Sequence, residues 1–377
     1  MTPRVPYFGY PERCRSWLGD VLDVVKGVGL SDEFILKSQV ARFEAAVASK
    51  VGARHAVACA SGTGALQLSL LALGVGPGDR VVTPAFSFMS SASTIALIGA
   101  TPVFADIDEE TATLDPGAAA AAADRVAGGV AAVVAAHLFS CVSAMGPLRD
   151  LAGRLAAPLL EDSAVSFGAE LDGRPAGRLG DLGVFSFFPG KPLGGIGDGG
   201  IVVTDDDRVA AECRMLRNHG QDPAVRFLYH RVGLNCRMDE TVAAFLLRRL
   251  AHLDDVLDRR RRLAEVYQER LRPLRPALAT PPDDFAGRSV YTYVVRTAER
   301  EELRKHLLGR GIESKVFYPA ALPLQPAFRA LGHAPGDFPV AERLAREHLA
   351  LPLHEELDPR TVELVAGEVA GFFGGRR

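Results

Sequence analysis

The sequence has few cysteines, and their positions show no pattern that would let them act together. Five cysteines occur among 377 residues, at positions 14, 59, 141, 213 and 236, and no two form a CxxC pair. No His-x-x-x-His helix face occurs either, so the sequence predicts neither a disulfide framework nor a metal site. Scattered free thiols are typical of a reducing compartment, and we expect a cytoplasmic protein.

Long apolar runs and an excess of one charge are also missing. No stretch approaches the ~18 apolar residues of a membrane helix, and the opening segment MTPRVPYFGYPERC lacks the apolar core of a signal peptide. The formal net charge of −3 gives no general attraction to nucleic acid or anionic membranes. The basic run 259–262 lies close to three aspartates, so we interpret it as a solvated helix face. We therefore expect no nucleic-acid or membrane partner.

The length and composition of the chain indicate a globular protein with two domains. Its residues are 48% hydrophobic and 24% charged, and 377 residues exceed one ordinary core. We predict an N-terminal arm over 1–30, a large domain over 31–257 and a small C-terminal domain over 258–377.

Between residues 55 and 205, short β-rich runs alternate with helical segments. The runs are almost continuously apolar, as in a parallel sheet covered on both faces, and they occupy 56–59, 80–84, 101–106, 129–137 and 157–162. Helices are predicted between them at 64–73, 89–98, 118–123 and 148–155. This alternation predicts an α/β domain that binds ligands at the carboxyl ends of its strands.

The second half of the chain has a different pattern. One long, charge-laced helical pattern runs from Asp239 to about Leu271, and we expect it to link the two domains. After Pro276 the sequence predicts strands at 289–297 and 311–319 and helices at 299–309, 340–349 and 359–373. These elements predict a smaller α+β domain.

Lys191 is the most informative residue of the chain. It is the only charged residue in LGVFSFFPGKPLGGIG, residues 182–197. An ammonium in such an apolar stretch is poorly hydrated, which favours the neutral amine. A neutral amine can form a Schiff base with an aldehyde. An ordinary lysine in a surface loop is the alternative interpretation.

The segment SGTGAL, residues 61–66, follows the first predicted strand and opens a helix. Small residues there let backbone N–H groups approach an anion, and the helix N-terminus adds a favourable dipole. The segment predicts a phosphate site that lacks the lysine of a P-loop. A glycine turn that binds nothing is the alternative.

Four further side chains are candidates for the same site. Asp162 ends the strand 157–162, so its carboxylate faces the ligand crevice and suits a protonated pyridine nitrogen, although it could also cap the next segment. Phe86 and Phe88 follow the strand 80–84, where one could stack on a flat ring or both could belong to the core. Ser186 lies between aromatic residues and could donate to a phosphate or bond to backbone.

A phosphate cradle, a carboxylate, a stacking ring and an activated lysine together meet the needs of pyridoxal 5′-phosphate. The ordered segments SGTGAL, PAFSF, EDSA, FSFFPGKPLGGIGDGG, LRNHG and GLNCRMDE resemble the DegT/DnrJ/EryC1/StrS family of sugar-nucleotide aminotransferases, from about Leu30 to the C-terminus. The resemblance implies the aspartate aminotransferase fold, called fold type I. In that fold a large domain with a mainly parallel mixed sheet covered by helices carries a smaller C-terminal α+β domain.

The resemblance also implies a role for individual residues. Lys191 matches the Schiff-base lysine of the family, which then acts as the general base. Asp162 would keep the pyridine nitrogen protonated. Phe88 would stack on one face of the ring, and Ala164 would pack against the other.

The phosphate contacts implied by the family come from two subunits. Gly62, Thr63, Gly64 and Ser186 would bind the phosphate from one chain, and the partner's Asn235 would reach it from the other. A homodimer with shared active sites is therefore implied.

Contacts to the substrate are expected from His219, Arg237 and Tyr318, which lie in or near the segments that carry the resemblance. Three other positions depart from the family pattern. Val165 stands where Gln or His usually supports the ring hydroxyl of the cofactor, and Phe167 and Pro323 stand where His is common or usual. These changes predict an unusual acceptor.

The leading hypothesis is a transaminase that moves an amino group from glutamate or glutamine to a keto group of a nucleotide-linked deoxysugar, for glycan or antibiotic sugar assembly. A cyclitol or another non-nucleotide ketone is an alternative acceptor, because the sequence shows no nucleotide-specific motif. A sugar dehydratase of the same family is disfavoured, since those enzymes replace the Schiff-base lysine with histidine.

Two further classes of protein are also disfavoured. The segment 195–200 satisfies GxGxxG, but it precedes the strand-like residues 201–204, whereas a dinucleotide-binding motif follows a strand and opens a helix. A sensor that binds the cofactor without catalysis would need an output module, and the sequence has neither a DNA-binding module nor a basic tail.

Overall fold

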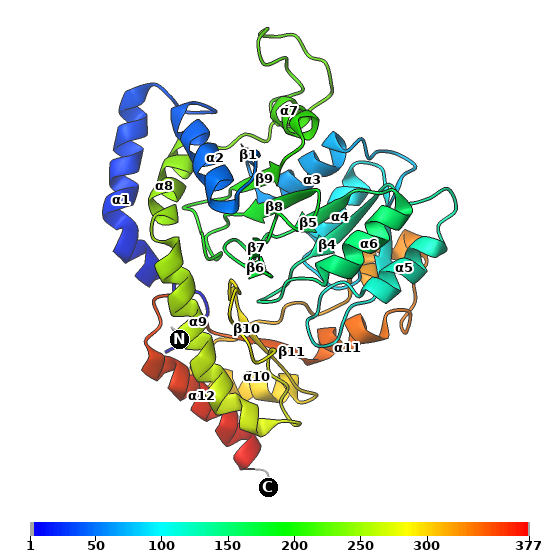
Figure 1. The fold of residues 1–377 in the computed structure, drawn as a ribbon. Coiled ribbons are helices and arrows are strands. Elements are labelled where there is room, and N and C mark those ends of the chain that lie inside the picture. The colour runs from blue at the N-terminus through cyan, green and yellow to red at the C-terminus, as the bar shows by residue number, and fades with distance from the viewer. Residues whose placement is uncertain (1–3, 376–377) are drawn as a thin grey trace.

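A seven-stranded sheet lies at the centre of the larger part of the molecule (Figure 1). The structure is a computed structural model in which residues 4–375 are described. The strands follow the spatial order β1-β9-β8-β5-β4-β2-β3. Their bounds are β1 His55–Cys59, β2 Arg80–Pro84, β3 Thr101–Ala105, β4 Ala132–Ala136, β5 Leu159–Asp162, β8 Leu182–Ser186 and β9 Gly200–Thr204. The five strands predicted up to residue 162 are confirmed.

Only β9 runs antiparallel to its neighbours in this sheet. It pairs antiparallel with β1 and β8, whereas the pairs β8–β5, β5–β4, β4–β2 and β2–β3 are all parallel. The sheet is therefore mixed but mainly parallel, as predicted. Parallel neighbours end at the same edge, so the loops after β2, β4, β5 and β8 meet there.

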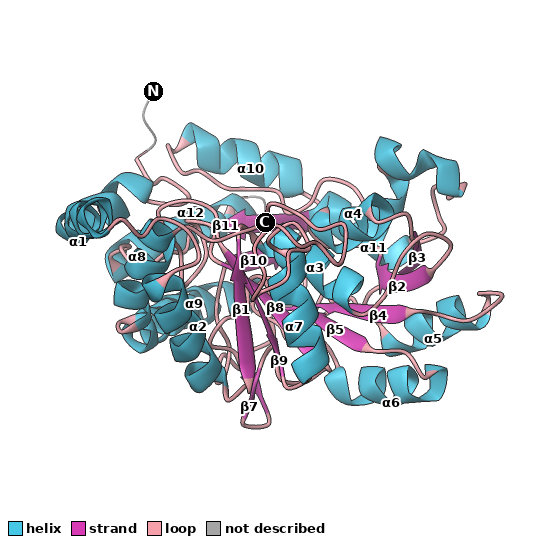
Figure 2. Ribbon diagram, turned by 90° about the horizontal axis from the view of Figure 1, so that it is seen from above, coloured by secondary structure: helices cyan, strands magenta, loops and turns pink. Residues whose placement is uncertain are grey.

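Helices cover both faces of the sheet, whose strands fan out from β1 to β3 (Figure 2). One face packs against α3 (Gly62–Ala72), α4 (Ser90–Leu97) and α7 (Asp207–Leu216). The other face packs against α2 (Ser38–Val51), α5 (Pro116–Asp124), α6 (Met145–Leu155) and α8 (Glu240–Leu250). The four helices predicted between the first five strands are confirmed.

Alternating residues of a strand serve the two layers. In β1, Val57 and Cys59 belong to the cluster with α3 and α7, whereas Ala56 and Ala58 belong to the cluster with α2. Side chains of a strand alternate between its faces, so a sheet covered twice needs apolar residues at every position. This requirement explains the continuous apolar runs in the sequence.

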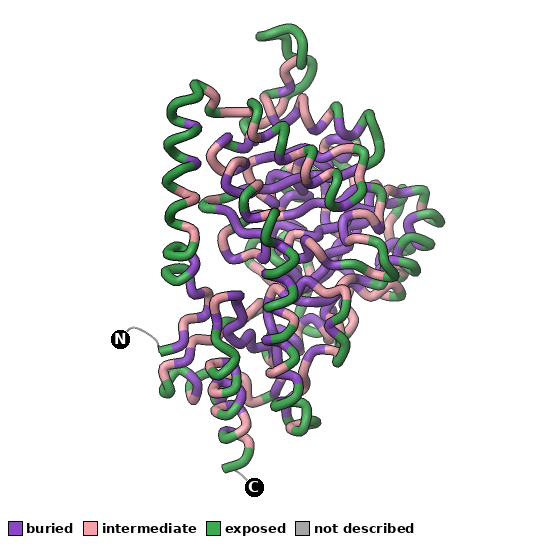
Figure 3. The backbone as a smooth tube through the Cα atoms, turned by 60° about the vertical axis from the view of Figure 1, so that its left-hand side comes forward, coloured by how far each residue is buried: buried purple, intermediate pink, exposed green. Residues whose placement is uncertain are grey.

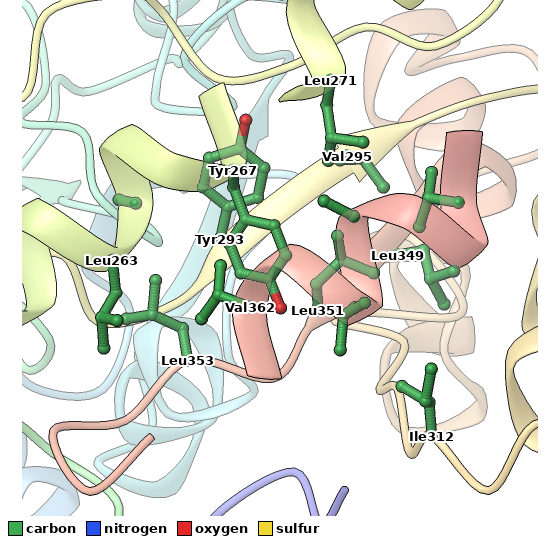
Figure 4. Close-up of a cluster of buried hydrophobic side chains, with 14 of the residues drawn as sticks. Leu263, Tyr267, Leu271, Tyr293, Val295, Ile312, Leu349, Leu351, Leu353 and Val362 are labelled. Carbon is green, nitrogen blue, oxygen red and sulfur yellow. The ribbon is translucent and has the colours of Figure 1, made fainter. Parts of the chain in front are cut away.

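The smaller part is built on a two-stranded antiparallel sheet of β10 (Tyr293–Arg296) and β11 (His348–Leu351). Its core includes side chains of α9 (Leu253–Leu271), α10 (Arg300–Gly309) and α12 (Pro359–Gly374). Tyr267 stacks on Tyr293 at 4.8 Å between ring centroids, close to Leu351 and Val362 (Figure 4). The N-terminal segment joins this core through Val5.

Three predictions for the second half are wrong in detail. The segment 311–319 forms no named strand and makes only single bridges, of Ile312 to Val5 and Lys315 to Ala350. The strand that pairs with β10 is instead β11. The helix predicted at 340–349 is α11, which covers Pro339–Glu347, and the last two residues of that prediction belong to β11. The single helix predicted over 239–271 is two helices, because α8 packs on α1 (Tyr10–Ser31) and α2 while α9 packs on α12.

The predicted domain limits stay a prediction. The limit at 257/258 falls inside α9, where Leu257 packs in the cluster of α2 and α8 and Leu263 packs in the core of the smaller part.

The remaining elements are the hairpin of β6 (Glu170–Leu171) and β7 (Arg174–Pro175) and three 3₁₀-helices, Arg272–Leu274, Leu322–Leu324 and Pro326–Leu331. Within residues 4–375, no helix has the length and apolar character to span a membrane.

Candidate active site

A cavity of about 530 Å³ lies at the carboxyl edge of the sheet, between the larger and smaller parts. Its walls come from the ends of β1, β2, β4, β5 and β8, from the N-terminal segment and from residues 291, 317 and 318. Eight of the predicted site residues line it, and they are Gly62, Thr63, Phe88, Asp162, Ala164, Ser186, Lys191 and Tyr318.

Lys191 enters the cavity from the loop between β8 and β9. Its Nζ lies 4.4 Å from the centroid of the Tyr291 ring. Desolvation lowers the pKa of Lys191 from 10.5 to about 8, although the negative charge of Asp162 opposes this shift. A substantial fraction of the amine is therefore neutral near physiological pH, as the apolar sequence around it predicts.

Asp162 lies at the end of β5 and is 5% exposed. Its Oδ2 accepts a hydrogen bond of 2.7 Å from Ser91 Oγ, and its Oδ1 accepts one of 3.3 Å from the backbone N–H of Ala164. Ser91 Oγ lies 2.9 Å from the hydroxyl of Ser87, a residue that lines the cavity. The carboxylate is thus buried and held in place by hydrogen-bond donors, which suits a cationic partner in the cavity.

The N-terminus of α3 forms the predicted phosphate cradle. Ser61 caps this helix, and its Oγ accepts a 3.0 Å hydrogen bond from Gly64 N–H. The first N–H groups of a helix have no intrahelical acceptor, so those of Gly62 and Thr63 are available to an anion. A Cβ on Gly62 would lie 2.7 Å from Ser186 Cβ, so only glycine lets the Ser186 hydroxyl approach this helix end.

Gly64 has a packing role next to the cradle. A Cβ at this position would overlap Cys236 Sγ, on the segment that follows Asn235. Gly64 is not part of the cavity wall itself, although its N–H completes the cap of α3. Because Gly64 has no side chain, the segment 235–236 can lie close to the cradle.

Aromatic rings form much of the remaining wall. Phe88 is 55% exposed, and its ring centroid lies 6.0 Å from that of Tyr318. Phe86, the other candidate for ring stacking, is buried and packs against Tyr318 and His348, so it belongs to the core. Phe88 is therefore the one of this pair with a face free to stack on a flat ring.

The three departures from the family pattern lie in different places. Val165 lines the cavity and is buried there. Phe167 packs in the core against Phe185 and Phe187, at 4.8 and 5.9 Å between ring centroids. Pro323 is buried in a 3₁₀-helix and does not line the cavity. Only Val165 therefore changes the wall of the site within one chain.

Asn235, Arg237 and His219 lie outside the cavity formed by one chain. Asn235 forms an isolated bridge with Asn218, and Arg237 Nη1 donates a 3.3 Å hydrogen bond to Asn218 Oδ1. His219 belongs to the same pair of segments, with its N–H bonded to Leu234 O at 2.8 Å. Their predicted roles in cofactor and substrate binding stay predictions.

Several wall residues were not found from the sequence, among them Phe8, His137, Tyr291 and Phe317. His137 Nδ1 accepts from Ser143 N–H at 3.2 Å, so its Nε2 carries the proton and donates to Glu161 Oε2 at 3.0 Å. Its place at the end of the predicted strand 129–137 was the available signal. Phe317 directly precedes the predicted Tyr318, which was the available signal for it, whereas Phe8 and Tyr291 had none because they lie far from the other site residues in the sequence.

A family model described as the DegT/DnrJ/EryC1/StrS aminotransferase family matches residues 19–370. The chain belongs to this family. The predicted aminotransferase and its fold class, fold type I, are therefore confirmed. Enzymes of this family use pyridoxal 5′-phosphate, as predicted.

Individual relatives of this family match almost the whole chain. A Streptomyces venezuelae protein named dTDP-3-amino-3,4,6-trideoxy-alpha-D-glucose transaminase is 37% identical over 97% of this chain and 95% of its own. A Geobacillus stearothermophilus protein named pleiotropic regulatory protein is 37% identical over 98% of both chains. The solved structure of S. venezuelae DesV has a TM-score of 0.93 and 36% identity, and the match covers 99% of both chains.

The residues of the cavity fit the cofactor of the family. The helix end at Gly62 and Thr63 suits its phosphate, and the exposed ring of Phe88 suits its flat ring. Asp162 supplies a buried anion and Lys191 an amine of lowered pKa in the same cavity. The GxGxxG match at 195–200 ends at the first residue of β9 and opens no helix, so the structure gives no support to a dinucleotide site there.

Proposed function

We propose that the protein transfers an amino group from glutamate or glutamine to a keto group of a nucleotide-linked deoxysugar. The observation that carries the proposal is the convergence of Lys191, Asp162 and the N-terminus of α3 in one cavity. The S. venezuelae relative, whose name specifies a dTDP-linked amino sugar, supports a nucleotide-linked acceptor. The expected product is an amino sugar for glycan or antibiotic assembly.

The residues of the site divide the work of binding and proton transfer. When bound, pyridoxal phosphate supplies an electron-withdrawing ring that carries the amino group between donor and acceptor. The N–H groups of Gly62 and Thr63 and the hydroxyl of Ser186 would hold its phosphate, and Phe88 and Ala164 would contact its ring. Asp162 would keep the ring nitrogen protonated.

Lys191 acts as the general base of the reaction. With a pKa of about 8, its amine is basic enough to take a proton from the substrate carbon. Above pH 8 more than half of the amine is in its neutral form. Lys191 and Asp162 line the same cavity, and in this proposal the amine moves protons while Asp162 binds the ring nitrogen. The aromatic walls at Phe8, Phe88 and Tyr318 limit the access of water to the amine.

A homodimer completes the proposed site through the partner's Asn235. The loop before Asn235 exposes a group of large apolar side chains, and they are Val225, Phe227, Leu228, Tyr229 and Val232. Val232 is 98% exposed, and a cluster of this kind is typical of a surface covered by another chain. Arg237 and His219 contact the substrate from the same loop region in this proposal, and Tyr318 contacts it from within the chain.

The proposed compartment is the cytoplasm, which the five free cysteines support. The dimer is tested by analytical ultracentrifugation. A mixed dimer of Lys191→Ala and Asn235→Ala chains would hold one site that carries neither change, if sites are shared between chains. Activity regained on mixing the two inactive variants supports shared sites, and none would contradict them.

The reaction is tested by absorbance and by acceptor panels. We expect purified protein to be yellow, glutamate or glutamine to remove the visible absorbance, and Lys191→Ala to prevent both. A colourless protein that binds NAD would refute the cofactor. Nucleotide-linked keto sugars and cyclitol ketones are then added to the bleached enzyme. Return of the yellow form only with cyclitol ketones would reject the nucleotide-sugar acceptor.

A further inference from the structure

Helix α1 is mostly exposed (Figure 3). It nevertheless buries an arginine near its beginning. Of its 22 residues, only Arg13, Val24 and Val28 are buried. Arg13 lies in the first turn, where the helix dipole disfavours a positive charge. Burial also lowers the pKa of Arg13 to about 10. An arginine placed at such a cost needs strong partners elsewhere.

Those partners include the loop that carries Lys191. Arg13 Nη1 donates a 2.6 Å hydrogen bond to Pro189 O, and Nη2 donates one of 3.4 Å to Lys191 O. The guanidinium therefore bridges two backbone carbonyls on either side of Gly190. The loop connects β8 and β9 and is not itself a strand, so Arg13 of α1 supplies hydrogen bonds that the sheet does not.

The third nitrogen of Arg13 is held by the C-terminal part of the chain. Arg13 Nε lies 3.0 Å from Glu355 Oε1, and Glu355 also pairs with Arg249 at 3.1 Å and Arg260 at 2.8 Å. All four side chains are less than 10% exposed. Burial opposes ionisation of Glu355, but the three guanidinium groups outweigh it and hold its pKa at about 2. Glu355 is therefore a permanent anion that fixes the orientation of Arg13.

Neighbouring residues of the same segment contact both sides of this connection. Gly9 has φ +57°, and a Cβ there would overlap the ring of His354, the neighbour of Glu355. The rings of Phe8 and Tyr10 stack at 5.0 Å between centroids. A Cβ on Gly190 would lie 3.0 Å from Phe8 Cε1 and 3.1 Å from Tyr10 Oη, so both rings pack directly on the Lys191 loop.

We propose that residues 8–13, which we call the N-terminal brace, position the Lys191 loop, and that Arg13 is the positioning residue that links this loop to Glu355. The brace ties the amine of the site to the C-terminal part of the chain, which also supplies Tyr291 and Tyr318 to the cavity wall. The proposal rests on the proposed role of Lys191. A loop that shifts by an ångström would misplace the amine relative to the substrate carbon.

The test compares Arg13→Gln and Arg13→Lys with Arg15→Gln, a control on the same helix whose side chain is 74% exposed. Glu355 keeps at least two arginine partners in each of the three variants, so we expect them to fold. In Arg13→Gln the rate constant of bleaching by saturating donor should fall roughly 10- to 100-fold, with little change in the half-saturating donor concentration. Arg13→Lys should be intermediate, and Arg15→Gln should match the unchanged protein.

A second readout needs no turnover. Apo-protein is mixed with pyridoxal phosphate, and the return of visible absorbance measures how well the lysine is presented. The guanidinium of Arg249, which shares Glu355 with Arg13, lies 4.4 Å from the ring centroid of Trp17, the single tryptophan. The fluorescence of Trp17 therefore reports changes in the contacts of Arg13. We expect slower uptake and altered fluorescence in Arg13→Gln, and neither in Arg15→Gln.

Several results would overturn the proposal. A lowered melting temperature in Arg13→Gln, with an unchanged bleaching rate constant and unchanged uptake, would show that Arg13 supports only the fold. If Arg13→Gln does not fold, Arg13→Lys decides, and an unchanged rate constant there also overturns the proposal. Lys191→Ala is measured in parallel. Bleaching that persists in Lys191→Ala would instead refute the proposed function, whatever the Arg13 variants do.

Discussion

At the scale of single residues, Lys191 and Asp162 meet because their strands are neighbours. β8 and β5 pair in parallel, with Asp162 opposite Val184, so both strands deliver their following residues to one edge. The surroundings also set the pKa of Lys191, because burial lowers it while the negative charge of Asp162 raises it by a smaller amount. Burial of the Lys191 ammonium therefore lowers the free energy of unfolding, and this effect can be measured.

Replacing Lys191 by methionine should stabilise the apo-protein at pH 7, by on the order of 1 kcal/mol. Folding lowers the pKa of Lys191 from 10.5 to about 8, so below pH 8 the folded chain carries an ammonium that its surroundings disfavour. The cost disappears as the pH rises toward 10.5. Urea unfolding at a series of pH values measures the difference. A variant that is less stable than the parent at pH 7 would contradict this prediction.

Ser91→Ala should weaken the hold on the cofactor. The change removes the 2.7 Å hydrogen bond to Asp162 Oδ2, and a hydrogen bond to a charged group contributes about 1.5–3 kcal/mol. We expect the dissociation constant of pyridoxal phosphate to rise at least about tenfold, measured by titration of apo-protein. Ser93→Ala, on the same helix and without a bond to Asp162, is the matched control. Equal affinity in the two variants would remove Ser91 from the site.

At the scale of elements, the N-terminus of α3 and the end of β8 form one unit. Gly62 and Ser186 approach each other so closely that a methyl group does not fit between them. The phosphate cradle thus depends on the distance between a helix and a strand, as well as on the presence of glycine. This dependence can be tested without touching any group that binds through its side chain.

Gly62→Ala should lower the affinity for pyridoxal phosphate more than the affinity for pyridoxal without phosphate. The added Cβ would lie 2.7 Å from Ser186 Cβ, so the hydroxyl must move away from the helix end. Overpacking of this kind costs about 1–3 kcal/mol. Gly76→Ala is a suitable control, because nothing lies within 4 Å of its added Cβ. A uniform loss for both ligands would argue against a role in the cradle.

At the scale of the whole molecule, the larger and smaller parts meet through buried ionisable groups. Glu355 joins arginines of α1, α8 and α9, and His354 lies beside it. Desolvation lowers the pKa of His354 from 6.5 to about 4, with a contribution from the positive charge of Arg260. Desolvation also lowers the pKa of His348 to about 3. These groups make the junction sensitive to acid.

The free energy of unfolding should fall as the pH drops from 6.5 to about 4. In this window the unfolded chain protonates His354 while the folded chain keeps it neutral, so protons favour unfolding. Glu355 is not the main cause, because its pKa falls from 4.5 to about 2 on folding and its contribution to stability therefore begins to decrease only below pH 4.5. His354→Leu should reduce the slope of stability against pH by on the order of 1 kcal/mol per pH unit, measured by urea unfolding. An unchanged slope would assign the acid sensitivity to other groups.

Much of this protein follows from local patterns in the sequence. Continuous apolar runs predicted β1 to β5, because a sheet covered on both faces needs apolar residues throughout. The small residues 61–64 predicted the phosphate cradle, and the apolar surroundings of Lys191 predicted its lowered pKa. Such features depend on residues close together in the chain.

The pairing of distant segments was decided by the tertiary structure alone. β11 forms where the end of a helix was predicted because it pairs with β10, and Phe167 is a core residue because Phe185 of β8 and Phe187 just after β8 pack beside it. The link from Glu355 through Arg13 to the Lys191 loop joins three segments separated by more than 150 residues each, as the contacts show. Sequence periodicity describes which face of an element is apolar, but it holds no information on which other element covers that face.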